Sequence, residues 1–364
     1  MKTITSLLNY YSHYNLMKIY FLVATQPNNL GDLLINRLLI EEISKYGEVY
    51  VDSYGLPNNF REHLYINDKI IDVEKFYGGT LKRFPPFKIL HKLRKDNFTH
   101  FFKSPGPTKI SFNKNSIALL FIYSYLSILK IDVSFVGIDL LIKNKVLKFF
   151  LDKSVNNILV RSKKNLEEYK FRTLNFNYIP DLALLYKPIL PVVKSKKIAI
   201  SFREITSNYS LFIASLDKLF SSLIMMGYTI EIFYQVIPDY LFNKRIYTDL
   251  KRDHVHFKED LLWFNELDFY ADKSFVLSNR LHVLLFGAAY QAVPIGYLDS
   301  NDAKVSKIFN IFNSLDLMDL VYTIPEIIDF QFILETYKDK CLRIKNNTEK
   351  STSISNDLIS SLLN

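Results

Sequence analysis

Cysteine, tryptophan and glycine are scarce in this chain of 364 residues, and the scarcity restricts what the chain can be. The one cysteine, Cys341, excludes an internal disulfide and a zinc site built from paired cysteines. A lone thiol is compatible with a reducing compartment. The 10 glycines fall well below the usual share of about 7%, so a glycine retained at a turn is expected to have a backbone reason.

Long apolar runs are also missing. The most apolar stretch, residues 117–129, is shorter than the ~20 residues that a membrane-spanning helix needs. Residues 1–16 lack the apolar core of a signal peptide and are interpreted as an extension that precedes the fold. These absences predict a cytoplasmic protein, with peripheral contact to the inner face of the cytoplasmic membrane as a further expectation.

Basic residues outnumber acidic ones, 46 against 37, which gives a formal net charge of +9. An excess of this size favours an anionic partner: nucleic acid, an anionic membrane surface or a phosphorylated ligand. The lysine-rich stretches lack the regular aromatic interleaving of a nucleic-acid platform, so no nucleic-acid partner is expected.

Short apolar runs alternate with segments of helical period, which predicts an α/β protein with two Rossmann-like, doubly wound domains facing a cleft. The expected division is residues 1–187, residues 196–330 and a helical tail at 331–364, with a proline-containing linker between the two domains. Strands are predicted at 18–24, 48–53, 69–73, 98–103, 131–137, 156–161, 197–202, 228–234, 254–257, 274–277 and 294–297. Helices are predicted at 33–46, 113–130, 163–172, 210–226, 261–270 and 281–290.

The turn Asn29-Leu30-Gly31-Asp32 follows the first predicted strand and opens the first helix. Free N–H groups at such a helix start can hold an anion or sugar hydroxyls. Asp32 can cap the helix or accept a proton from a hydroxyl. A capped turn without further function is the plain structural alternative.

A second block, Ser278-Asn279-Arg280-Leu281-His282, sits where a strand of the second unit gives way to an apolar helix. The planar fork of Arg280 suits a carboxylate or phosphate. His282 in the first helical turn can donate to an anion or act as an acid or base near neutral pH. A hydrogen-bonding histidine without catalytic work is the alternative.

Arg203 and Glu204 end the first strand of the second unit, where Arg203 is expected to point into the cleft. A surface ion pair between the two is the alternative reading. Asp181, Gln235 and Asp239 follow other strands and are weaker candidates for the same cleft. Searches for a P-loop, GxGxxG, HExxH, GxSxG, a DxD motif and paired cysteines all fail, so no metal site is predicted.

Together these blocks resemble the polysaccharide pyruvyl transferase family. The resemblance rests mainly on the Asn29–Asp32 turn and the Ser278–His282 block, and it is supported by Val160–Leu166, Ile179–Asp181 and Ile200–Arg203. The blocks follow the family order through residues from about 18 to 310. The chain departs from the family at 103–109, where a single Gly106 stands in place of a glycine-rich turn, and at 286–291, where the helix ends on bulkier residues.

The resemblance implies a GT-B-like fold, phosphoenolpyruvate as co-substrate and no cofactor. It implies a sugar acceptor, expected to be a lipid-linked oligosaccharide of a bacterial cell-surface glycan, on which a cyclic pyruvate ketal forms. By motif match, Arg203, Arg280, Leu281 and His282 would bind the donor. Arg203, Arg280 and His282 would be catalytic, with Asp32 or Glu204 as a helper. The acceptor would meet Asn29, Gly31 and Asp32.

Two other functions remain open on the sequence. A GT-B glycosyltransferase that uses a nucleotide sugar would share the architecture, and a non-catalytic scaffold of glycan biosynthesis would bind no donor. The sequence leaves the sugar, the hydroxyl pair, the ketal stereochemistry and the oligomeric state open.

Overall fold

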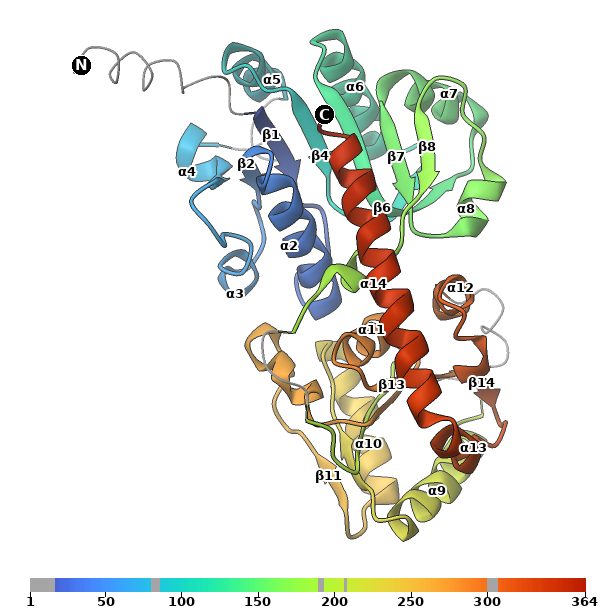
Figure 1. Ribbon diagram of the computed structural model, residues 1–364. Helices are drawn as coiled ribbons and strands as arrows, with labels where there is room; N and C mark the ends of the chain where they lie inside the picture. The colour runs from blue at the N-terminus through green and yellow to red at the C-terminus, as the bar shows by residue number, and fades with distance from the viewer. Residues whose placement is uncertain (1–16, 80–85, 189–192, 206–207, 300–306) are drawn as a thin grey trace, which may run out of the picture.

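A computed structural model describes residues 17–79, 86–188, 193–205, 208–299 and 307–364 of the chain. Residues 1–16, predicted as an extension, lie outside the described residues, as does the middle of the predicted linker at 189–192. In the described residues two parallel sheets are stacked end to end, each covered by helices (Figure 1).

The first sheet has the order β3-β2-β1-β4-β6-β7-β8, with β5 pairing β6, and all its pairings are parallel. Its strands are β1 (Met17–Leu22), β2 (Gly47–Asp52), β3 (Ile70–Asp72), β4 (His100–Lys103), β5 (Gly106–Ile110), β6 (Asp132–Ile142), β7 (Asn157–Val160) and β8 (Asn175–Tyr178). Its helices are α2 (Leu30–Ser44), α3 (Asn58–Arg61), α4 (Val73–Tyr77), α5 (Pro86–Lys95), α6 (Lys114–Ile128), α7 (Lys145–Ser154) and α8 (Lys163–Glu168), followed by the 3-10 turn η1 (Leu182–Leu185).

The second sheet has the order β11-β10-β9-β12-β13-β14 and is also parallel. Its strands are β9 (Lys197–Ser201), β10 (Thr229–Ile232), β11 (Val255–Phe257), β12 (Phe275–Ser278), β13 (Val293–Asp299) and β14 (Val321–Ile324). Its helical elements are α9 (Tyr209–Met225), η2 (Ile237–Asp239), α10 (Tyr240–Leu250), η3 (Phe264–Tyr270), α11 (Leu281–Ala289), α12 (Lys307–Ser314), η5 (Met318–Leu320), α13 (Phe330–Glu335) and α14 (Tyr337–Ser361). Two Rossmann-like domains facing each other, the predicted fold class, are therefore confirmed.

Several predicted elements differ in detail. The strand predicted to end at Gly137 continues to Ile142, because Gly137 adopts φ +70° at a register shift between β6 and β7 rather than ending the strand. The helix predicted at 163–172 ends at Glu168, and the one predicted at 261–270 is a 3-10 segment. The elements β5, α7, β8, α10, α12 and β14 had no counterpart in the prediction.

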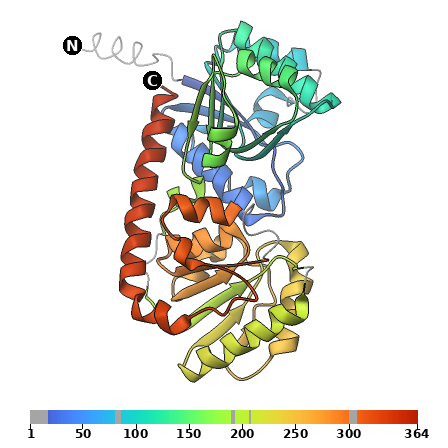
Figure 2. The ribbon, with the colours of Figure 1, turned by 90° about the vertical axis from the view of Figure 1, so that its right-hand side faces the viewer.

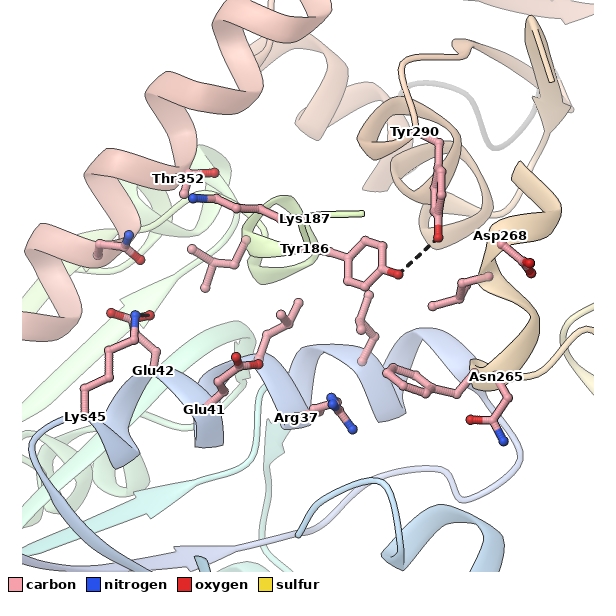
Figure 3. A pocket seen from close by; sticks show the side chains of 16 residues that line it. Arg37, Glu41, Glu42, Lys45, Tyr186, Lys187, Asn265, Asp268, Tyr290 and Thr352 are labelled. Carbon is pink, nitrogen blue, oxygen red and sulfur yellow. Dashed lines mark hydrogen bonds and ion pairs between the residues drawn. The ribbon is translucent and has the colours of Figure 1, made fainter. Parts of the chain in front are cut away.

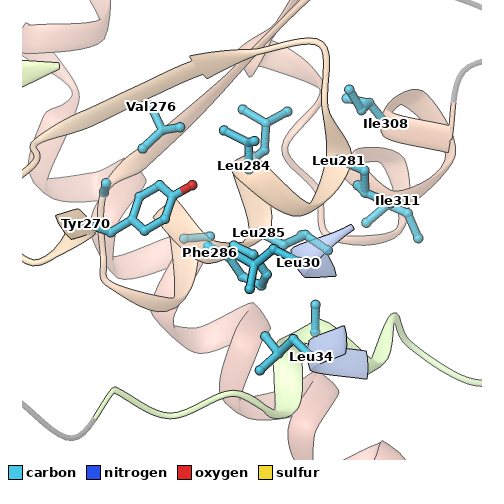
Figure 4. Packing of buried hydrophobic residues seen from close by; sticks show 14 of the residues in the cluster. Leu30, Leu34, Tyr270, Val276, Leu281, Leu284, Leu285, Phe286, Ile308 and Ile311 are labelled. Carbon is cyan, nitrogen blue, oxygen red and sulfur yellow. The ribbon is translucent and has the colours of Figure 1, made fainter. Parts of the chain in front are cut away.

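One hydrophobic cluster spans both domains, and a second lies within the first domain alone. Leu30 and Leu34 of α2 belong to the same buried cluster as Leu281 and Leu285 of α11 (Figure 4). The turn η1 contacts α2, α11 and α14, so it lies at the centre of this junction. A cluster formed in this way joins the domains by apolar burial as well as by the covalent chain.

Helix α14 runs along both domains and returns the chain end to the first one (Figure 2). It contacts α2 and η1 as well as α11 and β13. The Thr352 hydroxyl donates to the Leu184 carbonyl at 2.9 Å, which ties the helix to the connection between the domains. The predicted tail thus packs against both domains.

Candidate functional site

The turn after β1 supplies the first part of the site. Asn29 is the N-cap of α2, and its Oδ1 accepts a hydrogen bond from the Gly31 N–H at 3.0 Å. The Asp32 carboxylate instead accepts from the Thr25 hydroxyl at 3.0 Å and the Gln26 N–H at 3.3 Å. The expectation that Asp32 caps the helix is therefore wrong, since Asn29 already occupies that position. These two hydrogen bonds of Asp32 hold the preceding loop against the start of α2.

His282 stands on the first turn of α11 and faces that turn from the other domain. A Cβ added to Gly31 would collide with the His282 ring, so the two residues touch across the domain junction. The absence of a side chain at position 31 is what makes room for the imidazole. An antiparallel bridge between Asn29 and Val236 fixes the same approach. The structure thus brings together two residues that are distant in the sequence and were both predicted for the site.

The His282 imidazole is 13% exposed, and its Nε2 has no hydrogen-bond partner among the described residues. The nearest carboxylate oxygen to Nε2, Oδ1 of Asp181, lies 3.9 Å away. Burial lowers the pKa of His282 and outweighs the opposing effect of Asp181. The imidazole is therefore neutral near pH 7, and its Nε2 is buried beside Asp181 without a hydrogen-bond partner.

A buried ionic cluster lies behind His282. Arg161, at the end of β7, donates from Nη1 to Asp181 at 2.9 Å and from Nη2 to Asp139 at 2.6 Å. The Nζ of Lys307 from the second domain reaches Asp139 at 2.7 Å. Burial opposes ionisation of Asp139, but Arg161 and Lys307 hold its pKa at about 2. Asp139 and Arg161 therefore stay ionised near neutral pH, and the contact with Arg161 positions Asp181 beside His282.

Arg280 is held by a carboxylate. Its Nε donates to Asp239 Oδ2 at 2.8 Å and its Nη2 to Asp239 Oδ1 at 2.5 Å, a two-pronged contact. Burial raises the pKa of Asp239 in spite of Arg280 and Arg203. The next residue, Leu281, is buried in the shared core, so its side chain is not available to a ligand and only its backbone could serve one.

Arg203 has an exposed side chain after β9. The amide of Asn279 accepts from the Arg203 N–H at 2.7 Å and donates to its carbonyl at 3.0 Å, which ties Arg203 to the block that carries Arg280. Among the described residues no ion pair joins Arg203 to Glu204, so the alternative reading of a surface pair is not observed. Gln235, a weaker candidate, accepts from the Tyr270 hydroxyl at 3.1 Å inside the second domain.

The sequence prediction missed Arg161, Asp139 and Lys307 as parts of this site. Arg161 carried a usable signal, because an arginine directly after a buried strand has to find a counter-ion. Asp139 had none, since the strand that carries it was expected to end earlier. No group of histidine, cysteine, aspartate or glutamate residues in the described part of the chain is arranged to hold a metal ion.

A separate pocket of about 550 Å³ opens between the domains, lined by one face of α2, the η1 connection, η3 and α14 (Figure 3). The Tyr186 and Tyr290 hydroxyls meet there at 3.2 Å. The Arg37 guanidinium donates to the His63 carbonyl at 2.9 Å and lies 4.5 Å from the centre of the Phe264 ring. The lining of this pocket mixes cationic and anionic groups, and none of the predicted site residues belongs to it.

No protein-family model matches the chain, and no curated protein sequence does. Solved structures do share its fold. UDP-GlcNAc 2-epimerase from Neisseria meningitidis, bound to UDP-GlcNAc, is 12% identical with a TM-score of 0.55, and the match covers 95% of this chain and 100% of that one.

An O-GlcNAc transferase from Thermobaculum terrenum is 12% identical with a TM-score of 0.54, covering 96% of this chain but only 66% of that one. Phytolacca americana UGT2, complexed with UDP-2-fluoro-glucose and pterostilbene, is 9% identical with a TM-score of 0.54, covering 96% and 100%. At these identities the likeness shows the fold alone, and that fold is GT-B-like, as predicted. No described helix is long and apolar enough to cross a bilayer.

Proposed function

We propose that this chain is a transferase that moves the pyruvate unit of phosphoenolpyruvate onto two hydroxyls of a sugar in a bacterial cell-surface polysaccharide precursor. The product is a cyclic pyruvate ketal, and phosphate is released. One observation carries the proposal: Gly31 and Asp181 from the first domain both approach the ring of His282 from the second. These residues belong to three of the separate sequence blocks on which the family resemblance rests.

The arrangement suits the acid–base work of ketal formation. A proton adds to the methylene carbon of the donor, which leaves an oxocarbenium-like centre at the next carbon. One sugar hydroxyl adds there, the bond to the phosphate oxygen breaks, and the second hydroxyl closes the ring. His282 is neutral, and its ring would take the proton from an attacking hydroxyl once the acceptor enters the domain junction beside it. Asp181 at 3.9 Å would stabilise the imidazolium that forms, which would deliver its proton to the methylene carbon of a donor in the next turnover. The proton of the second hydroxyl would leave with the released phosphate.

Arg203 and Arg280 would bind the phosphate and the carboxylate of the donor. Phosphoenolpyruvate carries a phosphate and a carboxylate on few atoms, and guanidinium groups bind both with two parallel hydrogen bonds. Arg203 offers an exposed guanidinium beside the strand ends. Arg280 would offer its fork to the donor in place of Asp239, which holds that guanidinium in this structure.

The test is phosphate release from phosphoenolpyruvate in the presence of lipid-linked oligosaccharide acceptors. His282→Ala and Arg280→Ala should each lower kcat/KM by about 100-fold or more. His256→Ala and Arg245→Ala, on exposed positions of the second domain, are the matched controls and should leave turnover unchanged. Near-wild-type turnover in both site variants would contradict the assignment of His282 and Arg280 to the reaction.

A nucleotide-sugar glycosyltransferase is the second candidate, favoured by the likeness to folds that bind UDP-sugars. Thermal stability separates the two. Phosphoenolpyruvate should raise the Tm of a pyruvyl transferase, whereas UDP, GDP or CMP should raise the Tm of a nucleotide-sugar enzyme. A scaffold protein without a donor would respond to none of them.

A further inference from the structure

Helices α6 and α7 expose large apolar side chains on their outer surface. Phe121 is 72% exposed, Phe149 58% and Phe150 50%. The same region adds Phe112, Ile128, Leu141 and Val146, which are also exposed. We call this set the α6–α7 face. Exposed apolar groups that gather in one place mark a surface that contacts something other than water.

The two helices contact each other, and on α7 the Phe149 and Phe150 rings lie 5.9 Å apart, centre to centre. The hydroxyls of Ser124 on α6 and Ser154 on α7 lie 2.6 Å apart, so the two helices are in contact there. Phe121 and Ile128 stand about one helical turn to either side of Ser124, and Phe150 stands one turn before Ser154. The aromatic groups of the two helices therefore flank a common seam.

Lysines are frequent in the segment that carries the α6–α7 face. The stretch from 109 to 153 contains seven lysines and three acidic residues, the lysines being Lys109, Lys114, Lys130, Lys143, Lys145, Lys148 and Lys153. The acids are largely engaged elsewhere. Asp139 is bound to Arg161, and Asp152 accepts backbone N–H groups of the segment that begins at Arg172. The face thus combines apolar groups with a positive border.

The face begins at the same edge of the sheet as the candidate site. Strand β6 carries Asp139 of the ionic cluster and Leu141, and Lys143 is the first residue after the strand. Helix α7 starts at Lys145, at the carboxyl end of β6. The start of α7 therefore lies at the carboxyl edge of the first sheet, while α6 and α7 extend towards the outer end of the first domain (Figure 1).

We propose that the α6–α7 face docks the protein on an anionic lipid bilayer. The phenylalanine rings enter the boundary between headgroups and acyl chains, and the lysines meet anionic headgroups. The positive border favours this occupant over a second copy of the chain, whose identical face would carry the same charge. The docking does not depend on the reaction proposed above, so vesicle binding and phosphate release can fail independently.

The experiment is flotation of the full chain with phosphatidylcholine vesicles that contain or lack phosphatidylglycerol, at low and high salt. Binding should require the anionic lipid and weaken as salt is raised. The triple variant Phe121→Gln, Phe149→Gln, Phe150→Gln should bind at least about tenfold more weakly at both salt levels. The variant Lys143→Glu, Lys145→Glu, Lys153→Glu should lose the preference for anionic lipid.

The matched control is Met225→Gln with Leu241→Gln, which removes exposed apolar groups from the second domain and should bind vesicles like the unaltered chain. Circular dichroism checks that each variant is folded, and the two triple variants replace different residues so that one misfolded variant does not end the test. Vesicle binding that survives both triple variants would overturn the proposal. A concentration-dependent dimer in sedimentation that the phenylalanine variant abolishes, without vesicle binding by the unaltered chain, would overturn it as well and assign the face to a second copy.

Discussion

At the scale of single residues, the contact between Gly31 and His282 is the feature on which the candidate site depends. The glycine leaves room for a ring that comes from the other domain. Both residues were predicted to contribute to one cleft, because each sits where a strand ends and a helix begins. The carboxyl ends of the strands gather at one edge of each parallel sheet, and the two edges were expected to face the cleft.

Gly31→Ala should therefore damage the site by displacing His282. The added methyl group meets the imidazole, so we expect a loss of about 1–3 kcal/mol in the free energy of unfolding and a large loss of phosphate release. The double variant Gly31→Ala, His282→Ala is the control, since the smaller side chain removes the collision. Recovery of stability in the double variant, measured by urea unfolding, is expected; equal destabilisation with and without the histidine would contradict the contact.

Lys103 is a second residue with a testable consequence. Its ammonium is buried at the end of β4, where it donates to the Thr108 hydroxyl at 2.8 Å, and burial lowers its pKa to about 8 from 10.5. Because the unfolded chain binds the proton more tightly, the free energy of unfolding rises as pH increases between about 8 and 10.5.

Lys103→Met should raise the free energy of unfolding at pH 7 by about 2 kcal/mol, since a shift of this size costs at most ~3 kcal/mol and one hydrogen bond is lost. The variant should also lose the slope above pH 8 in denaturant unfolding. Lys109→Met, on an exposed position of the neighbouring β5, should change neither quantity. A Lys103→Met protein that is less stable than the parent would contradict the account of burial.

Other residues of the site could not have been placed from the sequence. Arg161 is buried with Asp139 of β6 and with Asp181, the N-cap of η1, which lie 22 and 20 residues away in the chain. Lys307 reaches Asp139 only because the two domains close on each other. Such pairings depend on tertiary geometry, whereas Gly31 and His282 stand at local strand-to-helix turns that the hydrophobic pattern already marks.

At the scale of elements, most strands and long helices were predictable because their apolar periods are strong. The exceptions have physical causes. Gly137 suggested the end of a strand but forms an irregularity inside β6. The helix α7 after that strand has a clear amphipathic pattern, which the prediction missed. The start of α6 was predicted to within one residue, at its asparagine cap Asn113.

The caps of α2 and α6 provide a matched pair of variants. Asn29 and Asn113 each accept a backbone N–H through Oδ1, from Gly31 at 3.0 Å and from Ser116 at 2.8 Å. Replacing either by alanine should cost about 1 kcal/mol of unfolding free energy. Only Asn29→Ala should also reduce phosphate release, because only that cap lies at the candidate site. An equal effect of both variants on turnover would show that the turn after β1 has no special part in the reaction.

At the scale of the whole molecule, the two domains were predictable but their joining was not. The sequence predicted a linker and a tail, while the structure shows one apolar cluster across the junction and α14 lying against both domains. Helix α14 is largely polar, so its pattern revealed little about the surfaces it contacts.

This shared core predicts a single unfolding transition. Scanning calorimetry should show one peak, and Leu34→Ala, a substitution in α2 that costs about 2–5 kcal/mol, should move that peak as a whole. Two separated peaks, of which Leu34→Ala shifts only one, would show that the domains unfold independently and that the common cluster contributes little.

The central claim concerns the reaction at the domain junction, and the mass of the product tests it most directly. Phosphoenolpyruvate labelled with ¹³C at all its carbons is incubated with the full chain and a panel of lipid-linked oligosaccharides. The account predicts that one acceptor gains all the labelled pyruvate carbons as a ketal, that phosphate is released in equal amount, and that His282→Ala forms no such product. An acceptor that gains a sugar from a nucleotide sugar, and no label from phosphoenolpyruvate, would contradict it.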